Sequence, residues 1–207
     1  MAQTDEILER LRAAGSEANV AWMARYGIRP AKAFGVAMPA IRAIAKELRW
    51  NTELASALWS TNVLEARILA TMIAEPEEIA EDEVERWVRE FDCWALCDSA
   101  CIGMLWKTPY AWRKVREWSR RKPEYERRAG FALLAALAVH DKHATDRQFR
   151  SALSLISKAS RDERNYVKKS VNWALRQIGK RNARLRPAAI HQAEILLLKA
   201  LRPEAEG

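Results

Sequence analysis

Residues that interrupt helices are scarce in this sequence of 207 residues, which contains only 7 glycines and 7 prolines. Runs in which β-branched and polar residues alternate, the pattern of half-buried strands, are also missing. Alanine-rich and charged stretches dominate instead, and these residues favour helices. The composition therefore predicts an all-α fold.

Long apolar runs are absent as well. No stretch approaches the roughly 18 consecutive apolar residues that a membrane-spanning helix requires. The amino terminus, MAQTDEILERLRAAG, is acidic and amphipathic and has no apolar segment typical of a secretory signal. We therefore expect a cytoplasmic protein that does not contact a membrane.

Cysteine and histidine are too few for most metal sites. The cysteines Cys93, Cys97 and Cys101 recur every four residues, which fits reduced residues in the core of a helical protein. No histidine lies near them, and their spacing matches no common zinc site. Nucleotide-binding glycine motifs, an EF-hand and a GxSxG motif are absent too. The sequence thus predicts neither a bound metal nor a cofactor.

The net charge of +8 is unevenly distributed. Residues 1–100 carry 11 Lys and Arg against 17 Asp and Glu, whereas residues 101–207 carry 24 against 10. A strongly basic half favours a polyanionic partner such as DNA, because binding releases counterions from the phosphates. A basic surface with no dedicated partner remains an alternative.

Helix signals follow one another with short joints, which predicts about a dozen helices in one domain over residues 1–207. The segments LEARILATM, LCDSACIGM, ERRAGFALL and VKKSVNWAL each place a polar residue before an apolar run. Their aligned residues are Arg67, Asp98, Arg128 and Lys169, at separations of 31, 30 and 41 positions. Such a period is typical of stacked antiparallel helix pairs, as in HEAT-like or armadillo-type α-solenoids. The four residues are then expected to approach one concave surface.

The stretch 164–182, RNYVKKSVNWALRQIGKRN, predicts an amphipathic helix with a basic face. At 3.6 residues per turn, its apolar residues collect on one side. The opposite side collects Lys169, Trp173, Arg176 and Lys180. An indole among cations indicates a surface that binds a nucleic acid backbone, although a surface tryptophan covered by another helix is also possible.

One carboxylate stands out from an apolar segment. Asp98 follows Trp94 by four residues, so both lie on the same face of a helix. A structural salt bridge or helix cap would explain it. Stabilisation of a positive charge that develops during a reaction would explain it too.

The segments FDCWALCD, ERRAGFALLAALAVHDK and RNYVKKSVNWALRQIGKRN resemble bacterial DNA alkylation repair proteins of the AlkD type, which are HEAT-like-repeat DNA glycosylases. The segments GIRPAKAFGVAMPAIRAIAKEL and EARILATMI are similar to that family as well, so the resemblance covers about residues 22–193. It implies a monomeric enzyme that hydrolyses the N-glycosidic bond of positively charged N3- or N7-alkylated purines in double-stranded DNA. The base need not enter a pocket in such enzymes.

The resemblance also implies roles for individual residues. Asp98 would stabilise the oxocarbenium sugar and position water, while Trp94 and Trp173 would pack on the deoxyribose. Arg128, with Arg127 beside it, would bind the DNA backbone. Lys169, Arg176 and Lys180 are added as phosphate contacts from the helical periodicity alone.

Three residues depart from the family pattern. Ala95 replaces an acid that commonly follows the motif's tryptophan, and Ala37 and Met38 stand where some members have polar DNA contacts. Two alternatives therefore remain: a helical-repeat binder of damaged or branched DNA that lacks the reaction, and a protein–protein scaffold. The scaffold explains the repeats but not the basic half.

Overall fold

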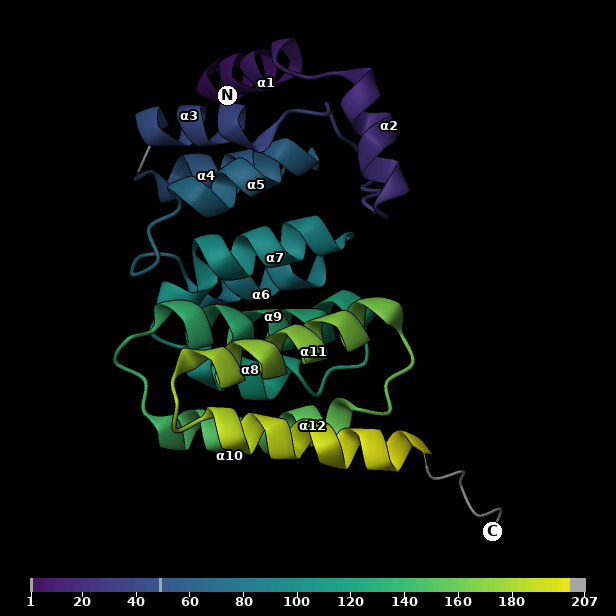
Figure 1. Cartoon of the computed structure of the whole chain (residues 1–207). Helices are drawn as coiled ribbons and strands as arrows, with labels where there is room; N and C mark the ends of the chain where they lie inside the picture. Colours follow the sequence, from purple (N-terminus) through teal and green to yellow (C-terminus); the bar gives the residue numbers. More distant parts are fainter. Residues whose placement is uncertain (1, 49, 202–207) are drawn as a thin grey trace. The chain divides into compact units, whose positions relative to one another are not determined.

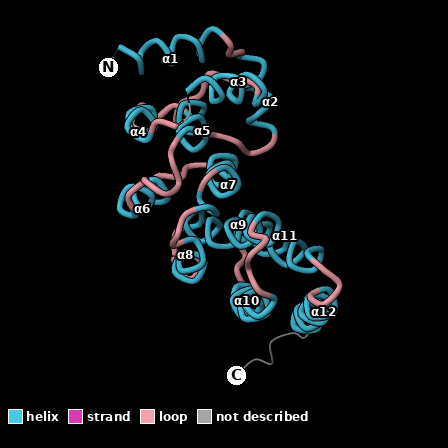
Figure 2. Tube along the Cα trace, turned by 90° about the vertical axis from the view of Figure 1, so that its left-hand side faces the viewer, coloured by secondary structure: helices cyan, strands magenta, loops and turns pink. Residues whose placement is uncertain are grey.

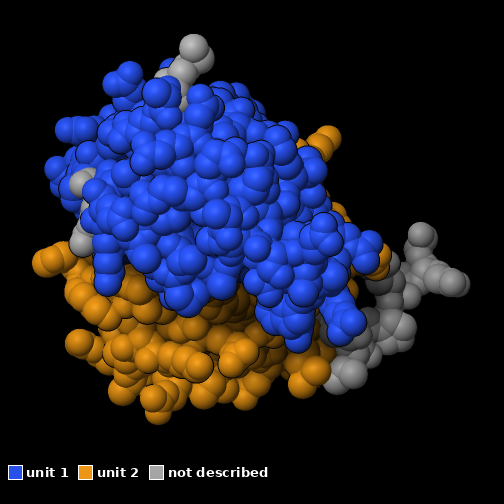
Figure 3. Space-filling view, turned by 90° about the horizontal axis from the view of Figure 1, so that it is seen from above, with its two compact units in different colours: residues 1–111 blue, residues 112–207 orange. Residues whose placement is uncertain are grey.

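The computed structural model describes residues 2–48 and 50–201, and these residues form helices and connecting segments without any strand (Figure 1). The predicted all-α class is confirmed. The chain divides into two compact units, residues 1–111 and 112–207 (Figure 3). The expectation of one domain over residues 1–207 stays a prediction.

Unit 1 contains seven α-helices and a 3-10 helix within the described residues. These are α1 (Ala2–Ala13), α2 (Glu17–Arg25), α3 (Met38–Leu48), α4 (Thr52–Trp59), α5 (Leu64–Ile73), α6 (Glu81–Arg89), α7 (Trp94–Gly103) and η1 (Leu105–Lys107). In Figure 2, α4 and α6 form one row, and α5 and α7 form a second row beside it. A tight turn joins α4 to α5, and Asn62 adopts a positive φ of 60° there. Pairs of this kind are what the sequence repeat predicted.

The core of unit 1 includes two stacked tryptophans that hold α4 against α6. The rings of Trp59 and Trp87 are 4.3 Å apart with an interplanar angle of 4°, and both side chains are fully buried. Each indole N–H donates to a carboxylate: Trp59 to Glu90 at 2.7 Å and Trp87 to Glu83 at 2.9 Å. The stack therefore buries large apolar area and leaves neither indole donor unsatisfied.

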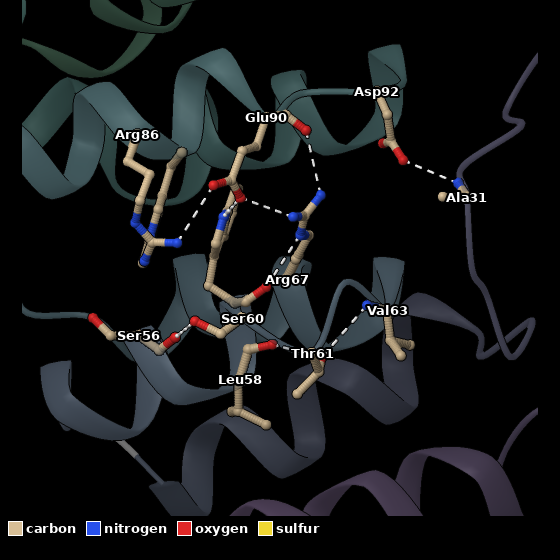
Figure 4. A network of polar contacts seen from close by, with 12 residues as sticks. Ala31, Ser56, Leu58, Ser60, Thr61, Val63, Arg67, Arg86, Glu90 and Asp92 are labelled. Atoms are coloured by element: carbon tan, nitrogen blue, oxygen red, sulfur yellow. Dashed lines mark hydrogen bonds and ion pairs between the residues drawn. The ribbon is translucent and has the colours of Figure 1, made fainter.

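Arg67 lies in the same network and corrects one expectation (Figure 4). Its side chain is buried, with Nη2 donating to Glu90 Oε2 at 2.8 Å and Nε donating to the carbonyl of Trp59 at 3.2 Å. The prediction that Arg67 shares a binding surface with Asp98 is wrong. A buried guanidinium is tolerated here because the Glu90 carboxylate compensates its charge.

Unit 2 contains most of α8 (Ala111–Trp118), followed by four longer helices. These are α9 (Glu124–His140), α10 (Asp146–Ala159), α11 (Asn165–Arg181) and α12 (Arg186–Leu201). Helices α9 and α11 run parallel, because hydrogen bonds join their first turns and also their last turns. Arg128 Nη1 donates to the carbonyl of Tyr166 at 2.6 Å, and Arg181 Nη1 donates to the carbonyl of Ala138 at 3.0 Å.

Two further expectations can be compared with the described residues. Cys93, Cys97 and Cys101 are buried free cysteines, as predicted, and burial raises the pKa of the Cys93 thiol to about 12. No helix in residues 2–48 or 50–201 is long and apolar enough to cross a membrane.

Candidate functional site

A cleft in unit 1 holds the two motif residues of α7. It has a volume of about 740 Å³ and is lined by α2, the segment before α3, α3 itself, α5 and α7. Apolar side chains form most of its wall, including Trp22, Ile41, Ile68, Trp94 and Ile102. Asp98 is one of the few charged residues in the lining. The cleft is therefore an apolar site with a carboxylate at its wall, which is the usual make-up of a ligand site.

Helix α7 begins at Trp94, and Asp98 follows one turn later on the same face. Both side chains are half-buried. The Trp94 indole is held in place, because its Nε1 donates to the carbonyl of Tyr26 at 3.0 Å. The Tyr26 ring in turn contacts Trp22 on α2, with ring centroids 4.4 Å apart. The structure thus brings Trp94 and Asp98 together in the cleft and adds Trp22 from α2, whose ring is flanked by Tyr26.

The segment between α2 and α3 is a fixed wall of this cleft, held by the buried carboxylate of Glu65 on α5. That carboxylate accepts three successive backbone N–H groups: Phe34 at 2.9 Å, Gly35 at 2.7 Å and Val36 at 3.2 Å. The Ala31 N–H also donates to Asp92 at 3.0 Å (Figure 4). These bonds connect the segment both to α5 and to the corner that precedes α7.

Gly35 shows how closely α2 joins this wall. Its φ is +76°, and a Cβ built there would lie 2.2 Å from the carbonyl oxygen of Ser16, so the position requires glycine. The Asn19 side chain on α2 donates to the carbonyl of Gly35 at 2.9 Å. Glu65 therefore positions not only residues 34–36 but also α2, which carries Trp22.

A local charge pattern in this region does not show in the charge balance of the two halves of the chain. Residues 18–46 contain no acid but five cations: Arg25, Arg29, Lys32, Arg42 and Lys46. All five are exposed, and none of them forms an ion pair with another described residue. Counting charge over residues 1–100 hid this segment because acidic helices follow it. A shorter window would have found it.

In unit 2, the basic face of α11 is confirmed. Val167, Ser170, Val171, Ala174 and Ile178 are buried. On the other side of the helix, Lys169, Arg176 and Lys180 are exposed and Trp173 is half-buried. The Lys169 Nζ lies 6.0 Å from the centre of the Tyr166 ring. This face therefore presents cations beside aromatic rings, a combination suited to a nucleic acid backbone.

The two arginines of α9 make contacts within the protein. Arg128 is only 5% exposed, and its guanidinium donates to the Tyr166 carbonyl. Arg127 pairs with Asp162 at 3.2 Å. A hydrogen bond from the Arg164 side chain to that carboxylate lowers the pKa of Asp162, and the charge of Arg127 adds to this effect. In this structure both arginines are thus used to join α9 to the start of α11. The direct backbone contact expected of Arg128 stays a prediction, and only 5% of the residue is exposed to make it.

The candidate residues therefore form two groups. Asp98 and Trp94 lie in the cleft of unit 1. Trp173, Lys169, Arg176 and Lys180 lie along α11 of unit 2. Chemically, the first group offers a carboxylate in an apolar site, and the second offers a basic surface with aromatic residues.

Three comparisons with known proteins were informative. A sequence profile of the family described as DNA alkylation repair enzyme matches residues 7–205. No curated protein matches the chain. A solved structure is similar with a TM-score of 0.83 and 22% sequence identity, over 93% of this chain and 82% of the other. It is described as a new family of proteins related to the HEAT-like repeat DNA glycosylases with affinity for branched DNA structures. The predicted HEAT-like repeat fold is confirmed by this similarity.

Proposed function

Because the chain belongs to the DNA alkylation repair enzyme family, we propose that it is a DNA glycosylase that removes positively charged N3- or N7-alkylated purines from double-stranded DNA. The observation that carries the proposal is the position of Asp98. This carboxylate lies beside Trp94 in an apolar cleft, in the unit that also holds the exposed cations of residues 18–46.

The reaction needs a negative charge near the sugar and little else from the protein. When the bond between C1′ and N9 breaks, its electron pair neutralises the cationic purine and leaves positive charge on C1′ and O4′. A carboxylate stabilises that charge more than it stabilises the neutral sugar of the ground state, so it lowers the barrier. Asp98 is proposed for this role and for accepting the proton of the water that adds to C1′.

Binding is proposed to depend on α11. Lys169, Arg176 and Lys180 would contact phosphates, and Trp173 would pack on a deoxyribose. Arg127 and Arg128 would act through the protein, since they fix the first turn of α11 against α9. A DNA contact made with cations on one helix face should be strongly weakened by salt.

Asp98→Asn tests the proposal, because it keeps the size of the side chain but removes the charge. We expect release of 7-methylguanine from methylated duplex DNA to slow by about 10²- to 10³-fold, the usual effect of losing one electrostatic stabiliser of a transition state. DNA affinity should stay unchanged. Asp82→Asn, an exposed aspartate on α6, is the matched control and should keep full activity. Equal release by wild type and Asp98→Asn at the spontaneous rate would refute the enzymatic role.

A second function is favoured by a specific observation. The similar solved structure is described as having affinity for branched DNA, and Ala95 replaces an acid expected beside the tryptophan. The chain would then bind branched or damaged DNA through the same cations without cleaving a glycosidic bond. Measured affinity for a four-way junction above that for a linear duplex, together with no release of 7-methylguanine, would select this function.

A further inference from the structure

We infer that the cleft of unit 1 is a binding site for one unpaired nucleobase of DNA, stacked on Trp22. This inference rests on the proposed function only in taking DNA as the ligand. It goes beyond that function, because excision as proposed does not require the base to leave the duplex. The supporting observations concern the aromatic residues, the volume and the charge of the cleft.

Exposed aromatic rings lie at the cleft wall. Trp22 is 54% exposed and lines the cleft, and Tyr26 beside it is 58% exposed. Two adjacent exposed aromatic rings form a contiguous apolar patch, and such patches mark interaction sites more often than single exposed residues do. The Tyr26 carbonyl accepts the Trp94 indole N–H, so the end of α2 that follows Trp22 is joined to α7. A nucleobase stacks well on such rings because every base has a π-face.

The cleft is large enough to hold a single nucleoside. About 740 Å³ lies within the range of about 300–1,000 Å³ that is typical of small-ligand sites. Its lining is mostly apolar, with a few polar groups such as Asn19, Arg42 and Ser99. Pockets for extruded bases have this make-up, since stacking holds the base and a few polar groups contact its edge.

The charge around the cleft fits the phosphates on either side of an unpaired base. Arg42 lines the cleft and is exposed. Arg25, Arg29 and Lys32 lie at the end of α2 and in the segment that follows it, exposed and without an ion pair to any described residue. Cations that are not engaged within the protein can neutralise phosphates at little cost. A DNA strand that places one base in the cleft would therefore have its backbone near these side chains.

The test compares two exposed tryptophans of the same unit. Trp22→Ala removes the proposed stacking ring, and Trp50→Ala removes a ring that is 48% exposed but does not line the cleft. Affinity is measured for a fully paired duplex and for the same duplex with one unpaired thymine. We expect wild type to prefer the bulged duplex. Trp22→Ala should lose about 5- to 100-fold of affinity for it, the effect of losing one stacked base, with little change for the paired duplex. Trp50→Ala should behave like wild type.

A second measurement uses wild type alone, so it does not depend on how a variant folds. The unpaired base is replaced by 5-iododeoxyuridine, which cross-links to aromatic side chains under irradiation. Mass spectrometry should find the adduct on Trp22 or Tyr26. Equal affinity for bulged and paired DNA, equal losses in the two variants, or adducts found only outside residues 18–46 would each overturn the inference.

The two proposals fail in different ways. Release of 7-methylguanine from paired, methylated DNA reports on the glycosylase, and discrimination of the bulge reports on the cleft. Enzymatic release without bulge discrimination would overturn the inference and leave the proposed function intact. Bulge discrimination without enzymatic release would support the inference and overturn the proposed function.

Discussion

Replacing Glu65 with glutamine tests whether one buried carboxylate holds the cleft wall. Its side chain is 1% exposed, and its two oxygens accept N–H groups from Phe34, Gly35 and Val36 at 2.7–3.2 Å. Successive N–H groups that converge on one anion form a concave anion site, and here the anion belongs to the protein itself. The glutamine is nearly the same size, so packing is conserved and the charge is lost.

The loss of unfolding free energy in Glu65→Gln can be estimated by counting the hydrogen bonds that the glutamine cannot make. Glutamine keeps one carbonyl oxygen, which can still accept the N–H groups of Gly35 and Val36. Its NH₂ group then faces the N–H of Phe34, a donor against a donor. Hydrogen bonds to a charged group contribute about 1.5–3 kcal/mol, and a buried donor left without a partner costs about 1–3 kcal/mol. One bond is lost and two are weakened, so we expect unit 1 to lose about 3 kcal/mol of unfolding free energy.

Urea unfolding and limited proteolysis measure the effect. The midpoint should fall with an unchanged dependence on urea, and trypsin should cut after Lys32 more rapidly, because this residue lies in the released segment. Glu77→Gln is the matched control: it is exposed in the connection between α5 and α6 and should change stability by less than about 0.5 kcal/mol. The reasoning is refuted if Glu65→Gln matches this control in both assays.

Two other predictions concern α11 and the buried thiols. Lys169→Ala should reduce the slope of log affinity for DNA against log salt by about one. The control Lys168→Ala, about 100° around the same helix, should change that slope less. Equal slopes for the two variants would contradict the assignment of Lys169 to the DNA-binding face. Iodoacetamide should leave Cys93 unmodified in the folded protein at pH 9 and modify it in urea, as scored by mass spectrometry. Because burial raises the pKa of Cys93 from its ordinary value of 9.0 to about 12 in the folded protein, the unfolded chain ionises first, and stability should fall as the pH rises from 9 towards 12. Alkylation of the folded protein at the unfolded rate would contradict this burial.

Helix positions were largely predictable because apolar periodicity is a local signal. The stretch 164–182 was expected to be a helix, and α11 spans Asn165–Arg181. Proline is also a local signal for the start of a helix, and α9 begins at Glu124 with Pro123 as its N-cap residue. Such boundaries depend on residues within one or two turns, which the sequence displays directly.

The surroundings of charged side chains were not predictable in the same way. Arg67 and Arg128 occupy the same position of the sequence repeat as Asp98 and Lys169. Their partners, however, are Glu90 and the carbonyl of Tyr166, 23 and 38 residues away. Whether a cation is buried against such a partner or exposed to solvent is decided by tertiary packing, which periodicity alone does not contain.

The cleft was missed for a related reason. Its wall includes a segment that the sequence marks only as a connection, with Gly27, Pro30 and Gly35. The segment becomes a wall because Glu65, some 30 residues later, binds three of its N–H groups. Hydrogen bonds between segments so far apart in the chain produce no periodic pattern in the sequence. The absence of acids from residues 18–46 was the signal that the sequence did offer.

Ala95 makes the role of Asp98 easier to isolate in this chain. It lines the cleft three residues before Asp98, and an acid there would lie on the same face of α7 and repel the Asp98 carboxylate. Glu65 also lines the cleft, but its oxygens accept three backbone N–H groups, which compensate its charge. Among the lining residues, the charge that would stabilise a cationic sugar is therefore assigned to Asp98. Any excision above the spontaneous rate that persists in Asp98→Asn would then have to come from packing on the sugar, because position 95 carries no second acid.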